Sequence, residues 1–315
     1  MAGTLGPTIK SEIVRSPVAA RVSLLWALLE CMRPSQWVKN GFVLAPLVFS
    51  ANLTEPALVL RELLAFAVFC LSASGMYLWN DSLDWKADLI HPLKRTRPIP
   101  SGRLSTTVAS AYGSLFLLVG ISAAFALNQP TGLLLCSYVL LNFLYSLWLK
   151  HTAILDLMCI ALGFVLRVMA GASAIQVEAS HWLLMCTFLL ALFLGIAKRR
   201  HEIITLAYDS AKHRRVLVNY NLPWLDQAST LLSGATVVAY ALYTVSPETQ
   251  LKFRTDKLIY TLPFVIYGIL QYLHLVHTGP HTGNPTTALL KNRPLLGCIA
   301  AWVLACSLII YMHRN

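Results

Sequence analysis

The clearest chemistry in the sequence is a short group of carboxylates that fits a metal ion. Asn80, Asp81, Asp84 and Asp88 fall within nine residues, and Asp84 and Asp88 follow Asn80 at intervals of four. If one helix continues to about residue 91, these groups share one face, where like charges repel. A divalent cation would relieve the repulsion, and oxygen-only ligands suit Mg²⁺. We therefore predict that Asn80, Asp81, Asp84 and Asp88 bind magnesium and that the three aspartates are catalytic.

Cations follow these carboxylates directly. Pro92 is expected to end the helix, and Lys94, Arg95 and Arg97 come within the next five residues. Arginine forks pair with phosphate oxygens in a bidentate manner, and lysine supplies a mobile point charge. Metal ligands followed by phosphate ligands indicate a site for a metal-bound diphosphate. The alternative is a solvated charged loop at a membrane surface, which does not explain the carboxylates on one helical face.

Long apolar segments position this loop. The chain has 315 residues, of which 57% are hydrophobic and 12% charged, against about 25% charged in an average soluble domain. Apolar runs of about 18 residues are typical of membrane helices, and lipid admits only helices or closed barrels. We predict an all-α polytopic membrane protein with about nine spans, the first of them short and containing Pro46: 41–53, 57–79, 104–127, 132–149, 152–177, 182–197, 227–245, 258–273 and 294–312.

The positive charges predict the orientation. The formal net charge is +11, and with alternating spans nineteen of the 25 lysines and arginines fall on the side of the N-terminus. The positive-inside rule places that side in the cytoplasm. We expect a protein of the cell inner (cytoplasmic) membrane whose loops 80–103 and 198–226 face the cytoplasm. Residues 1–33 are interpreted as a tail with an interfacial amphipathic segment, and 34–315 as the catalytic domain.

Two charged residues lie within an apolar run. Asp156 and Arg167 are eleven residues apart, about three helical turns, so they share a face but cannot pair with each other. A charge inside a membrane usually marks a functional site and has a partner. Lys150 or a substrate hydroxyl would suit Asp156. The alternative is a buried ion pair that only fixes helix packing.

The acidic and basic loop resembles a known family. Asn80, Asp84 and Asp88 fit the NxxxDxxxD motif of the UbiA superfamily of intramembrane prenyltransferases, at the end of the second helix. Residues 80–99 match the pattern NDxxDxxxDxxHPxKRxRPI of its decaprenyl-phosphate phosphoribosyltransferase branch at every specified position. Further matching segments are Arg33–Asn40, Tyr145–Ser146, Leu149–His151, Leu155–Asp156, Gly163–Arg167, Ala170–Gly171 and Ala197–Glu202. The resemblance implies a UbiA-like bundle around a cavity open to the cytoplasm.

The resemblance also implies a reaction. In this branch Mg²⁺ assists transfer of a 5-phosphoribosyl group from phosphoribosyl diphosphate to a polyprenyl (decaprenyl) phosphate, by direct displacement at C1, in cell wall biogenesis. The implied partners are these two substrates and the membrane, with a homotrimer as family precedent and no nucleic acid. The implied substrate-binding residues are Lys39, Lys94, Arg95, Arg97, Tyr145, Lys150, Asp156, Arg167, Lys198, Arg199, Arg200, His201 and Glu202.

Two departures leave alternatives open. Users of prenyl diphosphates carry a second acidic motif after the sixth span, where this chain has the unpaired Glu202, Asp209 and Asp226. Relatives have an acidic residue near the last helix, where this chain has Asn292. One alternative is a UbiA-type enzyme that moves a prenyl group from its diphosphate to an aromatic or polar acceptor. A membrane transporter or anion-binding channel is another, but the repeats typical of transporters are not evident.

Overall fold

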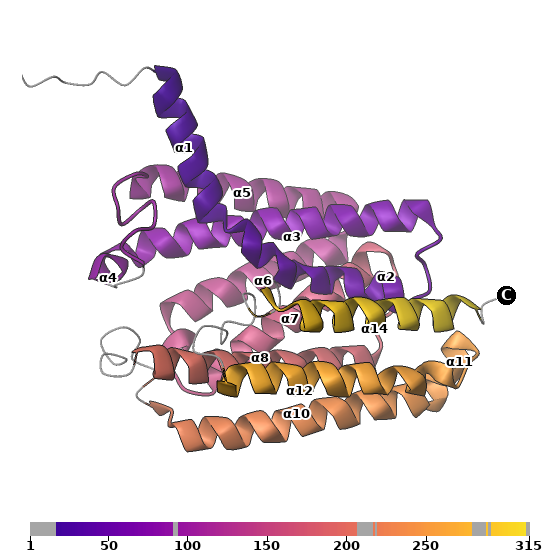
Figure 1. Cartoon of the computed structure of the whole chain (residues 1–315). Coiled ribbons are helices and arrows are strands. Elements are labelled where there is room, and N and C mark those ends of the chain that lie inside the picture. Colours follow the sequence, from indigo (N-terminus) through magenta and orange to yellow (C-terminus); the bar gives the residue numbers. More distant parts are fainter. Residues whose placement is uncertain are drawn as a thin grey trace, which may run out of the picture.

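The structure is a bundle of long helices that lie side by side (Figure 1). It is a computed structural model that describes residues 17–90, 94–206, 217, 219–278, 288 and 291–312, without the side chains of 17–22, 205 and 206. Within these residues, eight helices are long and apolar enough to cross a membrane. They are α3 (Pro56–Leu83), α5 (Thr106–Leu127), α6 (Gln129–Leu147), α7 (Leu155–Ala174), α8 (His181–Leu206), α10 (Leu222–Val245), α12 (Leu262–Thr278, together with the 3₁₀ turn η4, Lys257–Thr261) and α14 (Arg293–Met312).

The first expected span, 41–53, is not a long α-helix. The chain instead forms the 3₁₀ helix η1 (Pro34–Leu44) followed by the short α2 (Ala45–Phe49). Pro46 has no amide to donate to an α-helical ladder, which favours this arrangement. A 3₁₀ helix rises about 2.0 Å per residue against 1.5 Å in an α-helix, so these residues cover about 30 Å, the thickness of a hydrocarbon core. This segment therefore extends along the bundle from Pro34, seven residues before the expected start of the first span.

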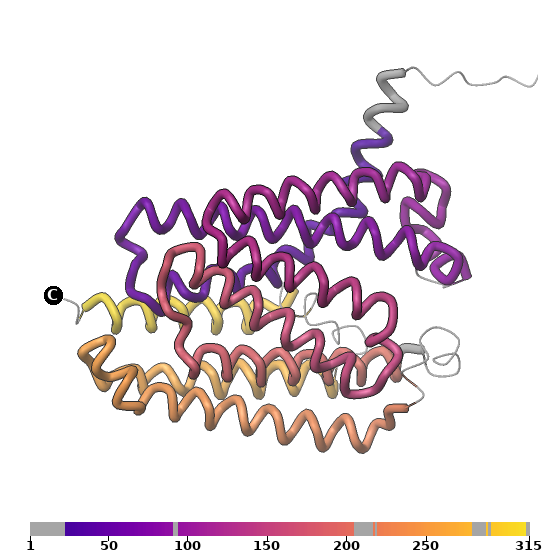
Figure 2. Tube along the Cα trace, turned by 180° about the vertical axis from the view of Figure 1, so that it is seen from behind, coloured from indigo at the N-terminus to yellow at the C-terminus, as the bar shows by residue number. Residues whose placement is uncertain are grey.

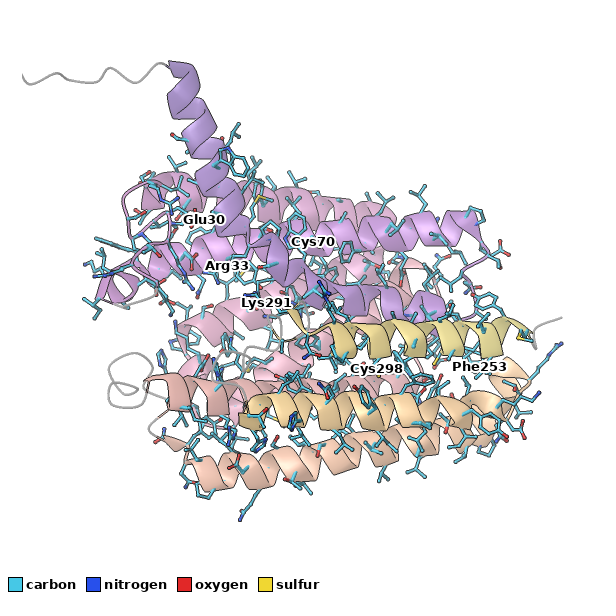
Figure 3. All side chains as sticks on the ribbon, viewed as in Figure 1. Glu30, Arg33, Cys70, Phe253, Lys291 and Cys298 are labelled. Carbon is cyan, nitrogen blue, oxygen red and sulfur yellow. The ribbon has the colours of Figure 1, made fainter. Side chains whose placement is uncertain are left out.

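The polar segments gather at one end of the bundle, called here the polar end. It holds α4 (Trp85–Ile90), η2 (Leu149–His151), the start of α7, the last turns of α8 and the start of α10, and the opposite end holds α11 (Pro247–Phe253) (Figures 1 and 2). Arg33 lies toward the polar end in Figure 3, and Phe253 lies at the other. Side-chain caps fix several helix starts by accepting an amide hydrogen three residues on, at Ser105, Asn128, Asn221 and Ser246.

Helix α1 (Pro17–Met32) projects from the polar end of the bundle (Figure 1). Its residues Ala27, Leu28 and Cys31 are buried against a cluster that includes Leu78 of α3, whereas Trp26 on the other side is exposed. The ion pair between Glu30 and Arg103, at 2.7 Å, ties it to the loop after α4. An interfacial position for this helix remains a prediction.

Small residues let α3 approach its neighbours closely. A Cβ on Gly75 of α3 would lie 2.8 Å from the carbonyl oxygen of Gly113 in α5, so both backbones meet there. The first segment meets α7 in the same way, because a Cβ on Gly171 would lie 2.0 Å from the Val43 carbonyl oxygen and 3.0 Å from Glu62 Oε1. Backbone contact through small residues is a common means of helix packing in membranes. It sets the position of η1 against α3 and α7.

Replacing Gly171 tests this contact. Alanine in a helix normally stabilises it relative to glycine, but here the added methyl group would force η1 away from α7. Overpacking of this kind costs about 1–3 kcal/mol, so Gly171→Ala should lower the melting temperature in detergent. Gly234→Ala is the control, since a Cβ at Gly234 of α10 meets nothing within 4 Å. Equal melting temperatures for the two variants would contradict the packing described.

Candidate active site

The helix that carries the acidic residues breaks at Asp84. Helix α3 ends at Leu83, Asp84 has φ −89° and ψ 5°, and α4 starts at Trp85. The amides of Asp84 and Asp88 still bond to the carbonyls of Asn80 and Asp84, both at 2.9 Å. The expectation of one helix through to residue 91 is therefore wrong, and residues 91–93, with Pro92, lie outside the described residues.

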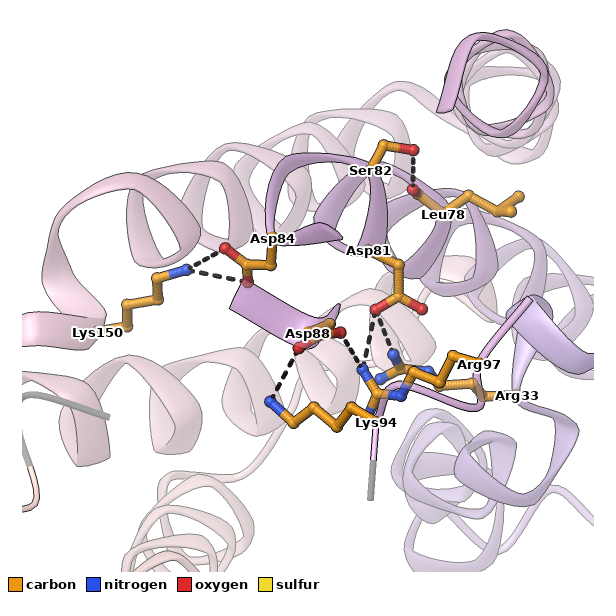
Figure 4. Close-up of polar contacts among 9 residues, drawn as sticks. All are labelled: Arg33, Leu78, Asp81, Ser82, Asp84, Asp88, Lys94, Arg97 and Lys150. Atoms are coloured by element: carbon orange, nitrogen blue, oxygen red, sulfur yellow. Dashed lines mark hydrogen bonds and ion pairs between the residues drawn. The ribbon is translucent and has the colours of Figure 1, made fainter. Parts of the chain in front are cut away.

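This break divides the carboxylates into two groups (Figure 4). Asp81 and Asp88 are almost fully buried and share Arg97, whose Nη1 lies 3.3 Å from Asp81 Oδ1 and 2.8 Å from Asp88 Oδ2. Asp84 instead accepts hydrogen bonds from Lys150 Nζ at 3.1 and 3.2 Å. Asn80, Asp84 and Asp88 therefore do not share the expected face, because the chain changes direction at Asp84. Asp81 and Asp88 lie together instead, on either side of Arg97.

Further cations complete this acidic cluster. Lys94 Nζ lies 3.3 Å from Asp88 Oδ1. Arg33 binds Asp81, and its guanidinium lies 4.9 Å from the centre of the Tyr77 ring. The sequence reasoning did not select Arg33 as a site residue, although it opens the matched segment Arg33–Asn40. Its backbone is left-handed, with φ 52°, at the start of η1. Three cations therefore surround two buried carboxylates.

The oxygen donors fit magnesium, although they do not form a closed cage. Among the residues described, no three histidine, cysteine or acidic side chains lie together as metal ligands would. Mg²⁺, however, is commonly held by one or two carboxylates and completed by substrate phosphates and water. Asp84 suits that role, because its side chain is 35% exposed and its partner is a flexible lysine. Asn80, Asp81 and Asp88 would supply further oxygen ligands to the same ion.

A second polar network lies at the start of α7. Asp156 is fully buried, and its carboxylate accepts a hydrogen bond from Arg199 Nε at 2.7 Å and one from the Tyr220 hydroxyl at 2.6 Å. The expected Asp156–Lys150 pair is therefore not formed. Arg199, also fully buried, donates to Glu202 at 2.7 Å and to the Tyr145 hydroxyl at 3.3 Å. This network joins α6, α7 and α8 to the start of α10.

Tyr220 is a residue that the sequence reasoning missed. It stands 64 residues from Asp156 and belongs to no motif, so no local spacing reveals the contact. Its hydroxyl also accepts the backbone N–H of Ile154 at 2.7 Å. Burial, and then the bond to Asp156, raise the pKa of Tyr220 above its ordinary value. The hydroxyl therefore keeps its proton and donates a hydrogen bond to the carboxylate.

Arg167 lies deeper in the bundle and meets only neutral groups. Its three nitrogens donate to Asn40 Oδ1, the Gly163 carbonyl and the Tyr138 hydroxyl, each at 2.8 Å. The Tyr138 ring lies 4.6 Å from the guanidinium carbon. Within the described part of the chain this buried charge has no carboxylate partner. Asn40 and Tyr138, which hold it, were also not selected from the sequence.

Lys39 lies on η1 in a positive field. It is half-buried and forms no ion pair with any residue that the structure describes. Burial, and then the charges of Lys198, Arg167 and Arg33, lower the pKa of Lys39 from 10.5 to about 7. Lys198 itself lies 3.8 Å from Glu202. Lys39 thus gains its full charge near neutral pH only if an anion lies beside it.

The three remaining predicted substrate-binding residues are Arg95, His201 and Arg200. Arg95 is exposed and has no partner in the chain as described, and His201 is half-buried on the last turns of α8. Arg200 turns toward α10 and α12, where its Nε lies 2.5 Å from Asp226 Oδ1 and its Nη1 donates to the Val276 carbonyl at 3.0 Å. The structure therefore brings Arg200 together with two other helices and not with the acidic cluster.

Comparison with known proteins shows the family of the chain. The sequence profile of the UbiA prenyltransferase family matches residues 41–291. A decaprenyl-phosphate phosphoribosyltransferase from Corynebacterium glutamicum is 34% identical, over 90% of this chain and 87% of its own length. The protein of the same name from Mycolicibacterium smegmatis is 32% identical, over 94% of this chain and 96% of its own length. This chain belongs to the UbiA prenyltransferase family.

The UbiA fold is also seen in solved structures. A UbiA homolog from Archaeoglobus fulgidus bound to GPP and Mg²⁺ has a TM-score of 0.66 and is 20% identical, over 90% of this chain and 99% of its own. The predictions of a UbiA-like helical bundle and of a membrane transferase are therefore confirmed. The roles of individual residues stay predictions.

Lys39 gives this site a measurable proton linkage. Between about pH 7 and 10.5 the amine is largely neutral in the empty protein. A bound anion raises its pKa, so binding in that window takes up a proton. Calorimetric titration with inorganic diphosphate and Mg²⁺, in two buffers of different ionisation enthalpy, should show less proton uptake in Lys39→Gln than in the wild type. Lys252→Gln at the opposite end, where burial also lowers the pKa, should match the wild type. Equal uptake in all three proteins would contradict this role for Lys39.

Proposed function

We propose that this enzyme transfers a 5-phosphoribosyl group from phosphoribosyl diphosphate to a polyprenyl phosphate at the cytoplasmic face of the cell membrane. The observation that carries the proposal is the surplus of cations over carboxylates around the acidic cluster. Asp81 and Asp88 face Arg33, Lys94 and Arg97. Arg167 adds a charge that no carboxylate of the described chain neutralises, and Lys39 adds a second one when a bound anion raises its pKa and it takes up a proton. The relatives named decaprenyl-phosphate phosphoribosyltransferase support the choice of substrates.

The number of anionic groups in the two substrates favours phosphoribosyl diphosphate over a prenyl diphosphate as the donor. Phosphoribosyl diphosphate brings a diphosphate and a 5-phosphate, and a polyprenyl phosphate acceptor brings a third anionic group. A prenyl diphosphate with an uncharged acceptor brings only one. Leaving a guanidinium such as that of Arg167 uncompensated in a buried site is costly, and a bound phosphate would relieve this cost. Positive charge both at the acidic cluster and deeper at Arg167 and Lys39 suits the more anionic substrate pair.

Two acidic residues near the end of α8 and the start of α10 favour the same donor. Glu202 is held by Arg199, and Asp226 is held by Arg200 and lies 3.4 Å from His277 Nε2. Both carboxylates are thus engaged by arginines, on the helices that flank the segment where prenyl-diphosphate enzymes are expected to have a second acidic motif. Asp209 lies outside the residues described.

In the proposed reaction, Asn80, Asp81, Asp84 and Asp88 hold Mg²⁺, which when bound supplies positive charge to the leaving diphosphate. Lys94, Arg95 and Arg97 bind diphosphate oxygens and stabilise the charge that develops as the bond from C1 to the diphosphate breaks. A phosphate oxygen of the lipid forms the new bond to C1, with inversion. This nucleophile is already an anion, so orientation of the two substrates replaces a general base.

In this scheme the remaining residues bind phosphate groups, bind the sugar or hold helix ends in place. Lys39, Lys150, Arg167 and Lys198 serve phosphate groups. Tyr145, Asp156 and Arg199 hold the helix ends in place through their shared hydrogen bonds. His201 and Glu202 are assigned to the ribose hydroxyls, and Arg200 to the contact with α10 and α12.

A donor comparison tests the proposal directly. The purified enzyme in liposomes is given Mg²⁺ and a polyprenyl phosphate with radiolabelled phosphoribosyl diphosphate. A parallel reaction contains a prenyl diphosphate with aromatic acceptors. We expect labelled lipid in the first reaction and no prenyl transfer in the second. Turnover with the prenyl diphosphate alone would overturn the proposal.

Replacing Asp84 tests the metal assignment. Asp84→Asn keeps the size of the side chain but removes the charge that would hold Mg²⁺ beside the diphosphate. We expect turnover to fall about a hundredfold or more, the scale of losing one group that stabilises a developing charge. Asp256→Asn is the control, because Asp256 is exposed on the segment between α11 and η4. Full activity of Asp84→Asn across a magnesium titration would remove Asp84 from the metal site.

A further inference from the structure

One tyrosine hydroxyl connects the buried Asp156 network to the turn that carries Lys150. The Tyr220 O–H donates to Asp156 Oδ1 at 2.6 Å and accepts the backbone N–H of Ile154 at 2.7 Å. Its ring lies 5.4 Å from that of Trp224 and packs in a cluster with Leu157. The hydroxyl is therefore held at a fixed place between the start of α10 and the start of α7.

Ile154 has a strained backbone at this point. Its φ of 69° and ψ of −47° lie in a region that β-branched residues rarely adopt. Such a conformation persists only where surrounding contacts enforce it. The Ile154 side chain is 55% exposed, so packing around it does little to enforce the conformation. The hydrogen bond from the Ile154 backbone N–H to the Tyr220 hydroxyl is the tertiary contact that holds the Ile154 backbone in this conformation.

The strained residue is the joint between η2 and α7. On one side, its carbonyl accepts the amides of Leu157 and Met158 at 3.0 and 2.9 Å and so starts the helix. On the other side, Lys150 stands four residues earlier in η2 and reaches Asp84 at 3.1 Å. A change of φ at the joint from positive to negative would swing η2 relative to α7. The ammonium group of Lys150 would then leave Asp84.

We propose that Tyr220 is a positioning residue for the transfer reaction. Through the Ile154 amide it holds η2 in place, and so it sets the position of Lys150 beside Asp84 and the affinity for the diphosphate of the donor. It does so without contact to substrate. The proposal rests on the proposed function for the identity of the donor, but the geometric chain from Tyr220 to Asp84 does not.

The variant Tyr220→Phe removes only the hydroxyl. The Asp156 carboxylate and the Ile154 amide would then each lose a hydrogen bond. We expect the KM for phosphoribosyl diphosphate to rise about tenfold, with kcat and the KM for the polyprenyl phosphate changed less than about twofold. A role in stability alone would reduce the amount of active enzyme, and hence kcat, and leave both KM values unchanged. That result would overturn the proposal.

Tyr272→Phe is the matched control. Tyr272 is a buried tyrosine of α12 whose hydroxyl has no hydrogen-bond partner among the described residues. Its loss should leave the KM for the donor unchanged. A rise equal to that in Tyr220→Phe would show a general effect of removing a buried tyrosine hydroxyl and would overturn the proposal.

A second substitution tests the route through Ile154. Glycine adopts a φ near +69° without strain. Ile154→Gly therefore removes the backbone strain that would move η2 when the Tyr220 hydroxyl is absent. In the Tyr220→Phe background, Ile154→Gly should restore most of the lost donor affinity. Ile154→Val keeps the branched side chain and should restore none. Equal KM values for both double variants would show that Tyr220 does not act through Ile154.

Two measurements make the result independent of turnover. Hydrogen–deuterium exchange of residues 149–158 should be faster in Tyr220→Phe than in the wild type and in Tyr272→Phe. Binding of inorganic diphosphate with Mg²⁺ should weaken about tenfold in the same variant. If the wild type binds diphosphate but transfers no phosphoribosyl group, the proposed function fails, and these two measurements alone decide the role of Tyr220. Unchanged exchange or unchanged diphosphate binding would overturn it.

Discussion

The candidate site depends on the burial of one carboxylate, that of Asp81. Arg33 reaches it from the start of the first segment and Arg97 from the loop after α4. Because Arg97 also binds Asp88, this single group links η1, α3, α4 and the basic loop. Removing one partner of a buried ion pair leaves an uncompensated charge, which costs several kcal/mol. The four segments are therefore held together at the polar end, and the other site residues take their places from this arrangement.

The balance of charge changes with depth in the bundle. At the polar end every described carboxylate of the acidic cluster meets at least one cation, whereas Arg167 and Lys39 meet neutral oxygen atoms or other cations. Electrostatic interactions strengthen where water is scarce. The deeper cations thus attract anions more strongly per charge than those at the polar end, where salt and carboxylates screen them. In the proposed reaction, this difference provides separate places for the anionic groups of two substrates.

The fold could be predicted because lipid allows few structures, whereas the site contacts could not. Long apolar runs predicted the eight long helices. The first span, expected at 41–53, is formed instead by η1 and α2, which begin at Pro34, before the apolar run. The loop motif identified Asp81, Asp84 and Asp88. Asp81 and Asp88 share Arg97, however, because the helix breaks at Asp84, and no residue type in the sequence predicts that break. The contacts of Arg33 with Asp81 and of Tyr220 with Asp156 span 48 and 64 residues. Local spacing carries no information about such contacts.

Two of the residues with positive φ lie at joints that position cations beside the carboxylates Asp81 and Asp84. Arg33, with φ 52°, starts η1, and Ile154, with φ 69°, starts α7 just after Lys150. Residues with unfavourable backbone angles persist where other contacts outweigh the strain. At the first joint that contact is the Arg33–Asp81 pair itself. At the second, Tyr220 holds the backbone and Lys150 completes the link to Asp84. A ligand that competes for Asp81 or Asp84 therefore competes with the contacts that hold both joints, so occupation of the site and the geometry of these helix starts are coupled.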